Sequence, residues 1–426
     1  MLDRNQPPVS QDITGIDLVA PQRLTFKNGL RVFVFNAAEQ DVIRMEWMFD
    51  HVFTQTENTV LHQATCEMLL EGTARYTSQQ IAEQIDFHGA FLVPQVNSDR
   101  SALSLFTLNK HLNKLLPLVK DILTGAAFPD KELVTYRRNN KQRLQVSLEK
   151  NSFIARRVAN EAIFGENRYG ICAKISDYDD LNADNMRSLF SQQYHPSNCT
   201  LVLSGSVTAE TIALVSRLFG DEWEATPTPV GDHAPVFGTE PLGSTLVEPR
   251  PDALQSAIRL GYRSIMRNHP EFPGLQVVNT LLGGYFGSRL MTNIREDKGY
   301  TYSIGSGLVS LKHGSFFTIA SEVGTAVTAA TLGEIEREIS RLKTETVGED
   351  ELQLVKSYMM GALLGSLENI FSHADKFKNV YFSGLDLDYY TYYANTVRDI
   401  SAAEIGRLAN KYLDYERLVK VVVGKI

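Results

Sequence analysis

Histidine, cysteine and glutamate lie close together in one segment of the sequence that has a helical pattern. His62 and Cys66 are four residues apart in the helical pattern 59–70, so they share one face of the expected helix, and Glu67 follows. A zinc site needs at least three ligands in tetrahedral reach, and a zinc hydrolase also needs a carboxylate base. No nearby carboxylate stands in an obvious third position. We therefore expect Cys66 in the core beside a surface His62, and a metal held by His62 and Cys66 is the alternative.

The same segment resembles the zinc helix of the insulinase/pitrilysin metallopeptidases, the inverzincins. In that family a His-x-x-Glu-His motif is followed by a short apolar run and Gly-Thr, and here Gly72 and Thr73 end such a run. Counting back from them places the motif on Gln63-Ala-Thr-Cys66-Glu67. The distal zinc-binding Glu of the family, counted along the next long helix, is placed near Leu144.

Both histidines and the catalytic glutamate of the motif are therefore missing. In the family, the two histidines bind zinc and the glutamate activates water. A register shifted by one puts His62 in the first ligand place, but Cys66 then replaces the second His and Thr65 replaces the base. Neither register rebuilds the hydrolytic site. The resemblance thus implies no metal in this chain, and we expect no peptidase activity from the chain by itself.

Further motifs of the family are spaced along residues 20–426. They are Phe164-Gly-Glu-Asn-Arg-Tyr-Gly170, Tyr194-His-Pro-Ser-Asn198, Leu281-Leu-Gly-Gly-Tyr-Phe-Gly-Ser-Arg-Leu290 and Ile294-Arg-Glu-Asp-Lys-Gly-Tyr-Thr-Tyr-Ser303. In the family, an arginine and a tyrosine seven residues apart follow such a helix, and the matching positions are Arg295 and Tyr302. The resemblance implies that this pair contacts the substrate and its transition state.

The chemistry of Arg295 and Tyr302 suits that role. Peptide hydrolysis builds negative charge on the carbonyl oxygen, and a guanidinium and a phenol aimed at that oxygen stabilise it. The structural alternative is an ion pair of Arg295 with Glu296 or Asp297 and a tyrosine packed on the sheet. Tyr300 is a nearby competitor, because strand alternation puts it on the same face as Tyr302.

The resemblance implies a subunit of a heteromeric peptidase. A paralogous partner with an intact His-x-x-Glu-His motif would supply zinc and base, and this chain would supply Arg295 and Tyr302 to bind a peptide substrate. A homodimer is the alternative assembly. Two other functions stay open: a catalytically inactive scaffold in a large assembly, and a peptide-binding clamp that works without a partner chain.

The chain divides into two related halves at a proline-rich stretch, 221–243. Each half ends with an N-capped amphipathic helix that leads into an apolar strand stopping at glycine. The pairs Leu181/Ile400 and Gly205/Gly424 are separated by the same number of residues, as expected of an internal duplication. We predict an N-terminal peptidase-like domain at 1–220, a linker at 221–243 and a C-terminal peptidase-like domain at 244–426.

Within each half, strands and helices alternate. The expected helices are 59–70, 78–87, 112–124, 131–149 and 274–282. The expected strands are 102–108, 256–262, 302–309 and 315–322, after a hairpin at 24–35 that turns at Lys27-Asn-Gly29. This pattern predicts an α+β protein of two homologous sandwich domains, each a mixed, mostly antiparallel sheet with packed helices, together forming half of a clamshell.

Composition excludes several classes of partner. The formal net charge is −8 over 426 residues, which argues against nucleic acid and against anionic membranes. No stretch approaches the roughly 20 apolar residues that span a bilayer. Three widely spaced cysteines and an N-terminus without a signal-peptide pattern favour the cytoplasm. A periplasmic location would follow if the N-terminus has been trimmed.

Overall fold

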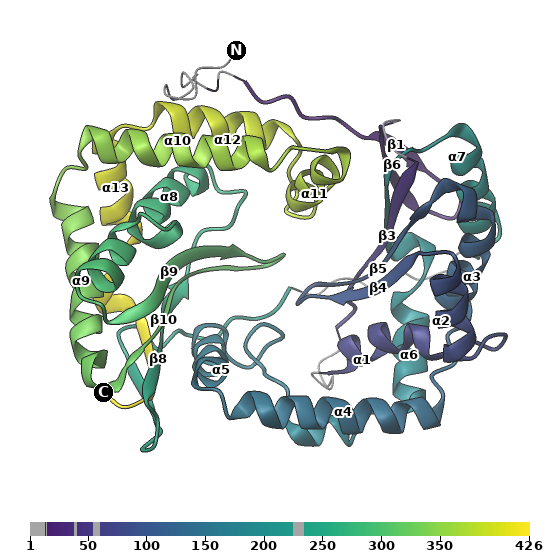
Figure 1. Cartoon of the computed structure of the whole chain (residues 1–426), viewed down its shortest axis with the longest axis horizontal. Helices are drawn as coiled ribbons and strands as arrows, with labels where there is room; N and C mark the ends of the chain where they lie inside the picture. Colours follow the sequence, from purple (N-terminus) through teal and green to yellow (C-terminus); the bar gives the residue numbers. More distant parts are fainter. Residues whose placement is uncertain (1–12, 14, 38–40, 54–59, 225–233) are drawn as a thin grey trace, which may run out of the picture.

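The computed structural model describes residues 13, 15–37, 41–53, 60–224 and 234–426. The chain forms two sheet-and-helix halves whose sheets lie on opposite sides of the molecule (Figure 1). Helices α4 and α5 run between the halves along one side, and α10, α12 and α11 run along the other. Pro227 and Pro229 of the expected linker lie outside the described residues.

The first sheet has six strands in the order β1-β2-β6-β3-β5-β4. Their bounds are β1 Gln22–Thr25, β2 Arg31–Asn36, β3 Val42–Asp50, β4 Phe91–Val96, β5 Arg100–Leu108 and β6 Cys199–Gly205. Only the β2–β6 pair is parallel. The expected hairpin is confirmed as β1–β2, and Gly29 in its turn has φ +88°, a left-handed conformation that glycine adopts without strain.

The second sheet repeats the first without its β1. Its five strands run in the order β7-β11-β8-β10-β9, with bounds β7 Thr245–Pro249, β8 Gln255–Arg263, β9 Thr301–Ser310, β10 Ser315–Gly324 and β11 Val419–Gly424. The β7–β11 pair is parallel and the remaining pairs are antiparallel. Strands β2, β6, β3, β5 and β4 thus correspond in order and direction to β7, β11, β8, β10 and β9. The predicted fold class, two related α+β halves, is confirmed.

In both halves, most helices lie between the hairpin β4–β5 or β9–β10 and the last strand, β6 or β11. The first half contains α1 Leu61–Glu67, α2 Ser78–Phe87, α3 Leu112–Gly125, α4 Asp130–Leu148, α5 Asn151–Phe164, α6 Ala183–Gln193 and α7 Ala209–Val215. The second contains α8 Phe272–Asn279, α9 Thr328–Thr344, α10 Glu349–Gly365, α11 Ile370–Tyr381, α12 Asp388–Asp399 and α13 Ala402–Tyr412. Among the described residues, no helix is both long and apolar enough to cross a bilayer.

Two expected helices end differently from their predicted bounds. Helix α1 stops at Glu67 and continues as a 3-10 turn, Met68–Glu71. Helix α8 begins before the predicted Gly274 and changes into a π-helical turn, Thr280–Gly284. The turn rests directly on β9, because a Cβ at Gly283 would lie 2.7 Å from the backbone nitrogen of Ser306. Glycine therefore allows a close approach of helix and strand that another residue would prevent.

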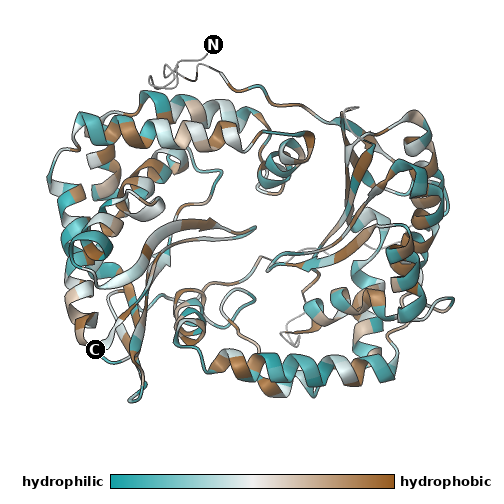
Figure 2. Ribbon diagram, viewed as in Figure 1, coloured by the Kyte–Doolittle hydropathy of each residue, from teal (hydrophilic) through white to brown (hydrophobic). Residues whose placement is uncertain are grey.

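Each half covers one face of its sheet with its own helices and exchanges one helix with the other half. Helix α11 packs Ala374 and Phe377 against Phe33 and Phe35 of β2 in the first sheet. Helix α5 lies against β8 and β11 of the second sheet, with its alanines facing the valines of β11. The central strands β6 and β11 are consequently buried on both faces, and their sequences are nearly continuous apolar runs (Figure 2).

Charged residues strengthen the contact that α11 makes with the first sheet. Arg44 and Glu46 on β3 are nearly inaccessible, and their side chains pair with each other at 3.1 Å. Arg44 also pairs with Asp375 at 2.9 Å, and Lys378 pairs with Glu46 at 2.7 Å. Each buried charge therefore has a partner, which removes the cost of an isolated buried ion. The two halves are thus held together by both apolar and ionic contacts.

Candidate functional site

The structure brings Arg295 and Tyr302 together on the second half. Arg295 lies in a π-helical turn, Met291–Asp297, that is anchored by the buried Met291 and Ile294. Tyr302 lies near the start of β9. The guanidinium carbon of Arg295 is 6.0 Å from the centre of the Tyr302 ring. A turn and a strand that are neighbours in sequence therefore present the two side chains at one place.

A third side chain, Phe286, belongs to the same place. The guanidinium carbon of Arg295 lies 4.5 Å from the centre of the Phe286 ring, a cation–π contact that orients the charge. Phe286 is 63% exposed and Tyr302 is 89% exposed. The sequence analysis missed Phe286, although a large aromatic residue directly after Gly-Gly-Tyr was the signal that could have found it. Below, the Arg–Tyr cluster means Phe286, Arg295 and Tyr302.

Arg295 retains donors for a ligand. Among the described residues its ion-pair partner is Glu296, at 3.5 Å, which is one of the two partners expected for a structural role. A pair at this distance on the surface contributes little to stability. Five N–H groups in a planar fork leave the guanidinium with further donors for a carbonyl oxygen.

Tyr300 and Tyr302 differ in their packing, although strand alternation led us to expect both on the same face. Tyr300 precedes β9, its backbone N–H donates to the carbonyl of Ile294 at 3.0 Å, and its ring packs against the core of the second half. Tyr302 extends into solvent. The strand alternation on which the expectation rested does not apply, because β9 begins only at Thr301. Tyr302 is therefore the tyrosine available to a ligand.

The positions that match the family's zinc motif make contacts within the protein. Gln63 is exposed and its amide donates to a Glu67 carboxylate oxygen at 2.9 Å. The other Glu67 oxygen accepts a hydrogen bond from the Tyr136 hydroxyl at 2.7 Å. Leu144 on α4 is part of the hydrophobic core of the first half. Gln63 and Tyr136 are therefore both hydrogen-bonded to Glu67, and Leu144 packs in the core.

Cys66 lies in the hydrophobic core of the first half. Its thiol contacts the carbonyl oxygens of Ala102 and Gln95 at 3.6 and 3.7 Å, and the residue is fully buried. Burial raises the pKa of the thiol to about 11. The thiolate is the form that binds metals and attacks electrophiles, so burial disfavours both kinds of chemistry at Cys66.

The expectation of a surface His62 is wrong. His62 is 7% exposed, its Nδ1 lies 2.9 Å from the Gln193 side-chain oxygen, and its ring stacks on His51 with centres 4.1 Å apart. The pKa of His51 is well below its usual value because the ring is buried and because His62 adjoins it. The error arose because α6, which supplies Gln193, covers this face of α1, and sequence periodicity does not reveal that contact.

His62 and Cys66 both lie on α1. In the described part of the chain, no group of three or more His, Cys, Asp or Glu residues is placed so that it could hold a metal ion. The assignment of zinc to a partner chain stays a prediction.

Another motif forms a junction between the halves. The Tyr169 hydroxyl donates to a carboxylate oxygen of Asp99 at 2.6 Å, and the backbone N–H of Lys312 donates to the other at 2.9 Å. Gly170 fits against the carbonyl of Gly165, where a Cβ would lie 2.0 Å from the oxygen. The Tyr-Gly motif therefore fixes the β9–β10 connection of the second half to the first sheet, beside a hollow of about 510 Å³ lined by both halves.

Comparisons with protein families and curated proteins agree with this architecture. The family model described as Peptidase M16 inactive domain matches residues 180–359. The uncharacterised zinc protease YmxG of Bacillus subtilis is 25% identical over 353 residues, which cover 82% of this chain and 85% of that protein. The probable inactive metalloprotease YmfF of the same organism is 23% identical over 269 residues, 62% of each chain.

Solved structures show the same fold over nearly the whole chain. A peptidase M16 inactive domain from Pseudomonas fluorescens has a TM-score of 0.84 at 18% identity, covering 96% of this chain and 99% of that one. A protease from Helicobacter pylori has a TM-score of 0.87 at 16% identity, with 96% and 100% covered. The periplasmic protease PqqL from Escherichia coli has a TM-score of 0.78 at 14% identity, with 99% and 48% covered.

Proposed function

We propose, from the premise that the chain belongs to the insulinase/pitrilysin (peptidase M16) family, that it is the substrate-binding subunit of a heteromeric zinc metallopeptidase. In this proposal the chain binds a peptide and supplies Arg295 and Tyr302 to a zinc site on a paralogous partner. The partner's intact His-x-x-Glu-His motif supplies the metal and the base.

The observation that carries the proposal is the exposure and closeness of the Arg–Tyr cluster. A tyrosine that is 89% exposed contributes little to folding, and among the described residues its guanidinium neighbour forms a weak ion pair with Glu296. Both groups donate hydrogen bonds, and donors preorganised around a developing oxyanion give the largest single stabilisation in many hydrolases. The arrangement therefore supports a role toward a ligand rather than toward the fold.

The chemistry of the motif positions supports the assignment of metal to another chain. Gln63 and Leu144 carry no side-chain group that zinc prefers, and Glu67 already accepts two hydrogen bonds. Cys66 is held as a neutral thiol by burial. The bound zinc ion, as a Lewis acid in the partner, would polarise the scissile carbonyl and activate water.

A peptide-binding clamp that works without a partner is the second candidate. It is favoured by the hollow of about 510 Å³ that both halves line, since a chain closed around such a hollow can hold a peptide by itself. A cytoplasmic location, suggested by three free thiols, stays a prediction for either candidate.

Reconstitution tests the proposal. The chain is purified alone, a paralogue with an intact motif from the same genome is purified alone, and each is assayed with a pool of fluorogenic peptides before and after mixing. We expect co-elution of the two chains and chelator-sensitive hydrolysis that requires both. Hydrolysis by this chain alone would refute the proposal. Tight peptide binding without association with the paralogue would replace it with the clamp.

A further inference from the structure

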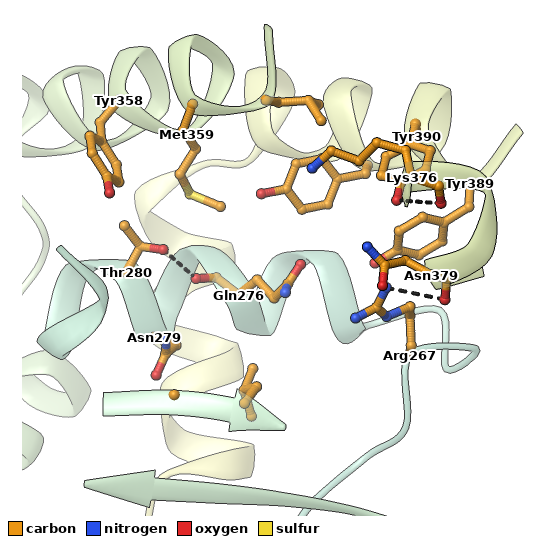
Figure 3. A pocket seen from close by; sticks show the side chains of 15 residues that line it. Arg267, Gln276, Asn279, Thr280, Tyr358, Met359, Lys376, Asn379, Tyr389 and Tyr390 are labelled. Atoms are coloured by element: carbon orange, nitrogen blue, oxygen red, sulfur yellow. Dashed lines mark hydrogen bonds between the residues drawn. The ribbon is translucent and has the colours of Figure 1, made fainter. Parts of the chain in front are cut away.

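A second hollow, separate from the Arg–Tyr cluster, lies within the C-terminal half. It encloses about 440 Å³ between α8, α10, α11, α12 and β9, a volume in the range of small-ligand pockets (Figure 3). Among the described residues that line it, Arg267 and Lys376 are charged and none is acidic. The pocket is therefore cationic, although the chain as a whole is acidic.

The two cations come from distant parts of the chain. Arg267 lies in the connection between β8 and α8, and Lys376 lies on α11. Figure 3 shows the Arg267 guanidinium beside Asn379, whose carbonyl accepts from Nη1 at 3.3 Å. The Nε of Arg267 is buried without a hydrogen-bond partner. A buried donor without a partner carries a desolvation cost.

Among the residues that the structure describes, no carboxylate forms an ion pair with Arg267 or Lys376. The acidic residue next to Lys376, Asp375, is held by Arg44 at 2.9 Å and by Lys378 at 2.8 Å. Among the described residues neither Arg267 nor Lys376 forms an ion pair. The pKa of Lys376 lies below its usual value, because the amine is half-buried and because Arg267 repels its charged form. An anion between them would remove that repulsion and stabilise both charges.

The remaining lining suits an amino-acid residue that carries the anion. Met359, Leu363 and Tyr389 add apolar and aromatic surface. Phosphate would satisfy the cations but leave the apolar surface unused.

We propose that this pocket binds a carboxylate of a peptide, with Arg267 and Lys376 as its counter-ions. The carboxylate can belong to the C-terminus or to an acidic side chain. The inference rests on the proposed function, because it names the chemical feature by which the subunit selects its peptides.

The position of the pocket fits that role. It shares Arg267 and Asn379 with the hollow that both halves line, so the two spaces are neighbours. Strand β9 connects it to the Arg–Tyr cluster, since Gly307 and Leu308 line the pocket and Tyr302 is the second residue of the strand. The seven residues from Tyr302 to Leu308 span about 20 Å, so an extended peptide segment of about seven residues would reach from one to the other.

Calorimetric titration of the full chain with hippurate tests the pocket without any peptidase partner. Hippurate is a minimal peptide carboxylate, and hippuramide is its uncharged counterpart. We expect hippurate to bind about tenfold or more tightly than hippuramide. Arg267→Gln and Lys376→Gln should each remove the difference, whereas Arg267→Lys should keep most of it. Lys131→Gln, which removes an exposed cation on α4, should leave binding unchanged.

Equal binding of hippurate and hippuramide would refute carboxylate binding in this pocket. So would a preference for hippurate that survives in Arg267→Gln and Lys376→Gln variants with unchanged melting temperature. A loss of the preference in Lys131→Gln would do the same, because it would make the effect one of general charge.

Decapeptides with a blocked N-terminus and otherwise uncharged residues then identify the source of the carboxylate. One has a free C-terminus, one has a C-terminal amide, and one has the amide and a single internal Glu. Preference for the first supports C-terminal recognition, and preference for the third supports side-chain recognition. Equal binding of all three decapeptides would agree with the clamp or the subunit function but would refute carboxylate recognition by the pocket. A hippurate preference without binding of any decapeptide, alone or in the reconstituted complex, supports the pocket and overturns the proposed function.

Discussion

Helix α1 of the first half and the Arg–Tyr cluster of the second use polar side chains in opposite ways. In α1, Cys66 is fully buried and Glu67 accepts hydrogen bonds from Gln63 and Tyr136. In the cluster, Tyr302 is 89% exposed and Arg295 has one ion pair at 3.5 Å. Polar groups that are satisfied within the chain serve the fold, and exposed donors remain for a ligand.

The difference is informative because the two regions occupy corresponding places in the duplicated fold. Helix α1 follows β3 and precedes β4, and α8, which leads to the cluster, follows β8 and precedes β9. The helix at this position is thus part of the core in the first half, whereas in the second half it leads to hydrogen-bond donors that a ligand can reach. We infer that the hydrogen-bond donors offered to a substrate's reacting group come from the second half rather than from α1.

The largest expected effect is on catalysis in the reconstituted complex. Arg295→Ala or Tyr302→Phe should lower turnover by about 10²–10³-fold, the usual cost of one lost oxyanion donor. The melting temperature should not change, since neither side chain is buried. Steady-state kinetics with one fluorogenic peptide measure the rate.

Tyr300→Phe is the matched control for the cluster, because it removes a hydroxyl two residues from Tyr302 and should leave turnover unchanged. Unchanged rates in Arg295→Ala and Tyr302→Phe would assign both residues to structure and would remove the contrast between the two regions.

The next effect is on stability and belongs to the first half. Leu144→Ala should reduce the free energy of unfolding by about 3 kcal/mol, because it leaves a cavity in the core. Urea denaturation measures this loss, and the turnover per folded complex should stay within about twofold. A variant as stable as the parent would show that Leu144 is not packed as the fold requires.

The buried thiol predicts a dependence of stability on pH. The pKa of Cys66 is raised from 9.0 to about 11 in the folded chain, so the folded state holds this proton more tightly than the unfolded state. The resulting stabilisation is present below pH 9 and is lost as the pH rises from 9 to 11, by up to about 3 kcal/mol. Tyrosines also titrate in this range, so the measurement is the difference between the parent and Cys66→Ala in urea denaturation. Parallel pH profiles of the two proteins would contradict a buried thiol.

The smallest effect compares one tyrosine from each region. Tyr136→Phe removes the hydrogen bond to Glu67 and should cost about 1 kcal/mol of unfolding free energy. Tyr302→Phe removes an exposed hydroxyl and should cost nothing measurable. Equal losses in the two variants would show that Tyr302 also contributes to the fold.

Much of this fold could be predicted from local patterns. The hairpin at 24–35, the helix at 78–87 and the strands that flank Lys312 follow from turn residues and from periods of two or 3.6, which act over a few residues. The exchange of α5 and α11 between the halves could not be predicted, because an apolar helix face does not specify which sheet it will meet. The burial of His62 under α6 was missed for the same reason.

The site was predictable only in part. Arg295 and Tyr302 stand in a motif, and they are close in sequence, so their closeness in space follows from one turn and one strand. Arg267 precedes α8 and Lys376 lies on α11, and these separate elements meet only in the folded chain. No local pattern of residues marks the two cations, and only the three-dimensional structure shows that neither has an acidic partner among the described residues.

The zinc content of the isolated chain and of the complex tests the central claim most directly. Elemental analysis after exhaustive dialysis should find far less than one zinc ion per isolated chain and about one per heterodimer. The zinc of the heterodimer should disappear when the motif histidines of the partner are replaced. One zinc ion per isolated chain, lost on His62→Ala or Cys66→Ala, would contradict the account.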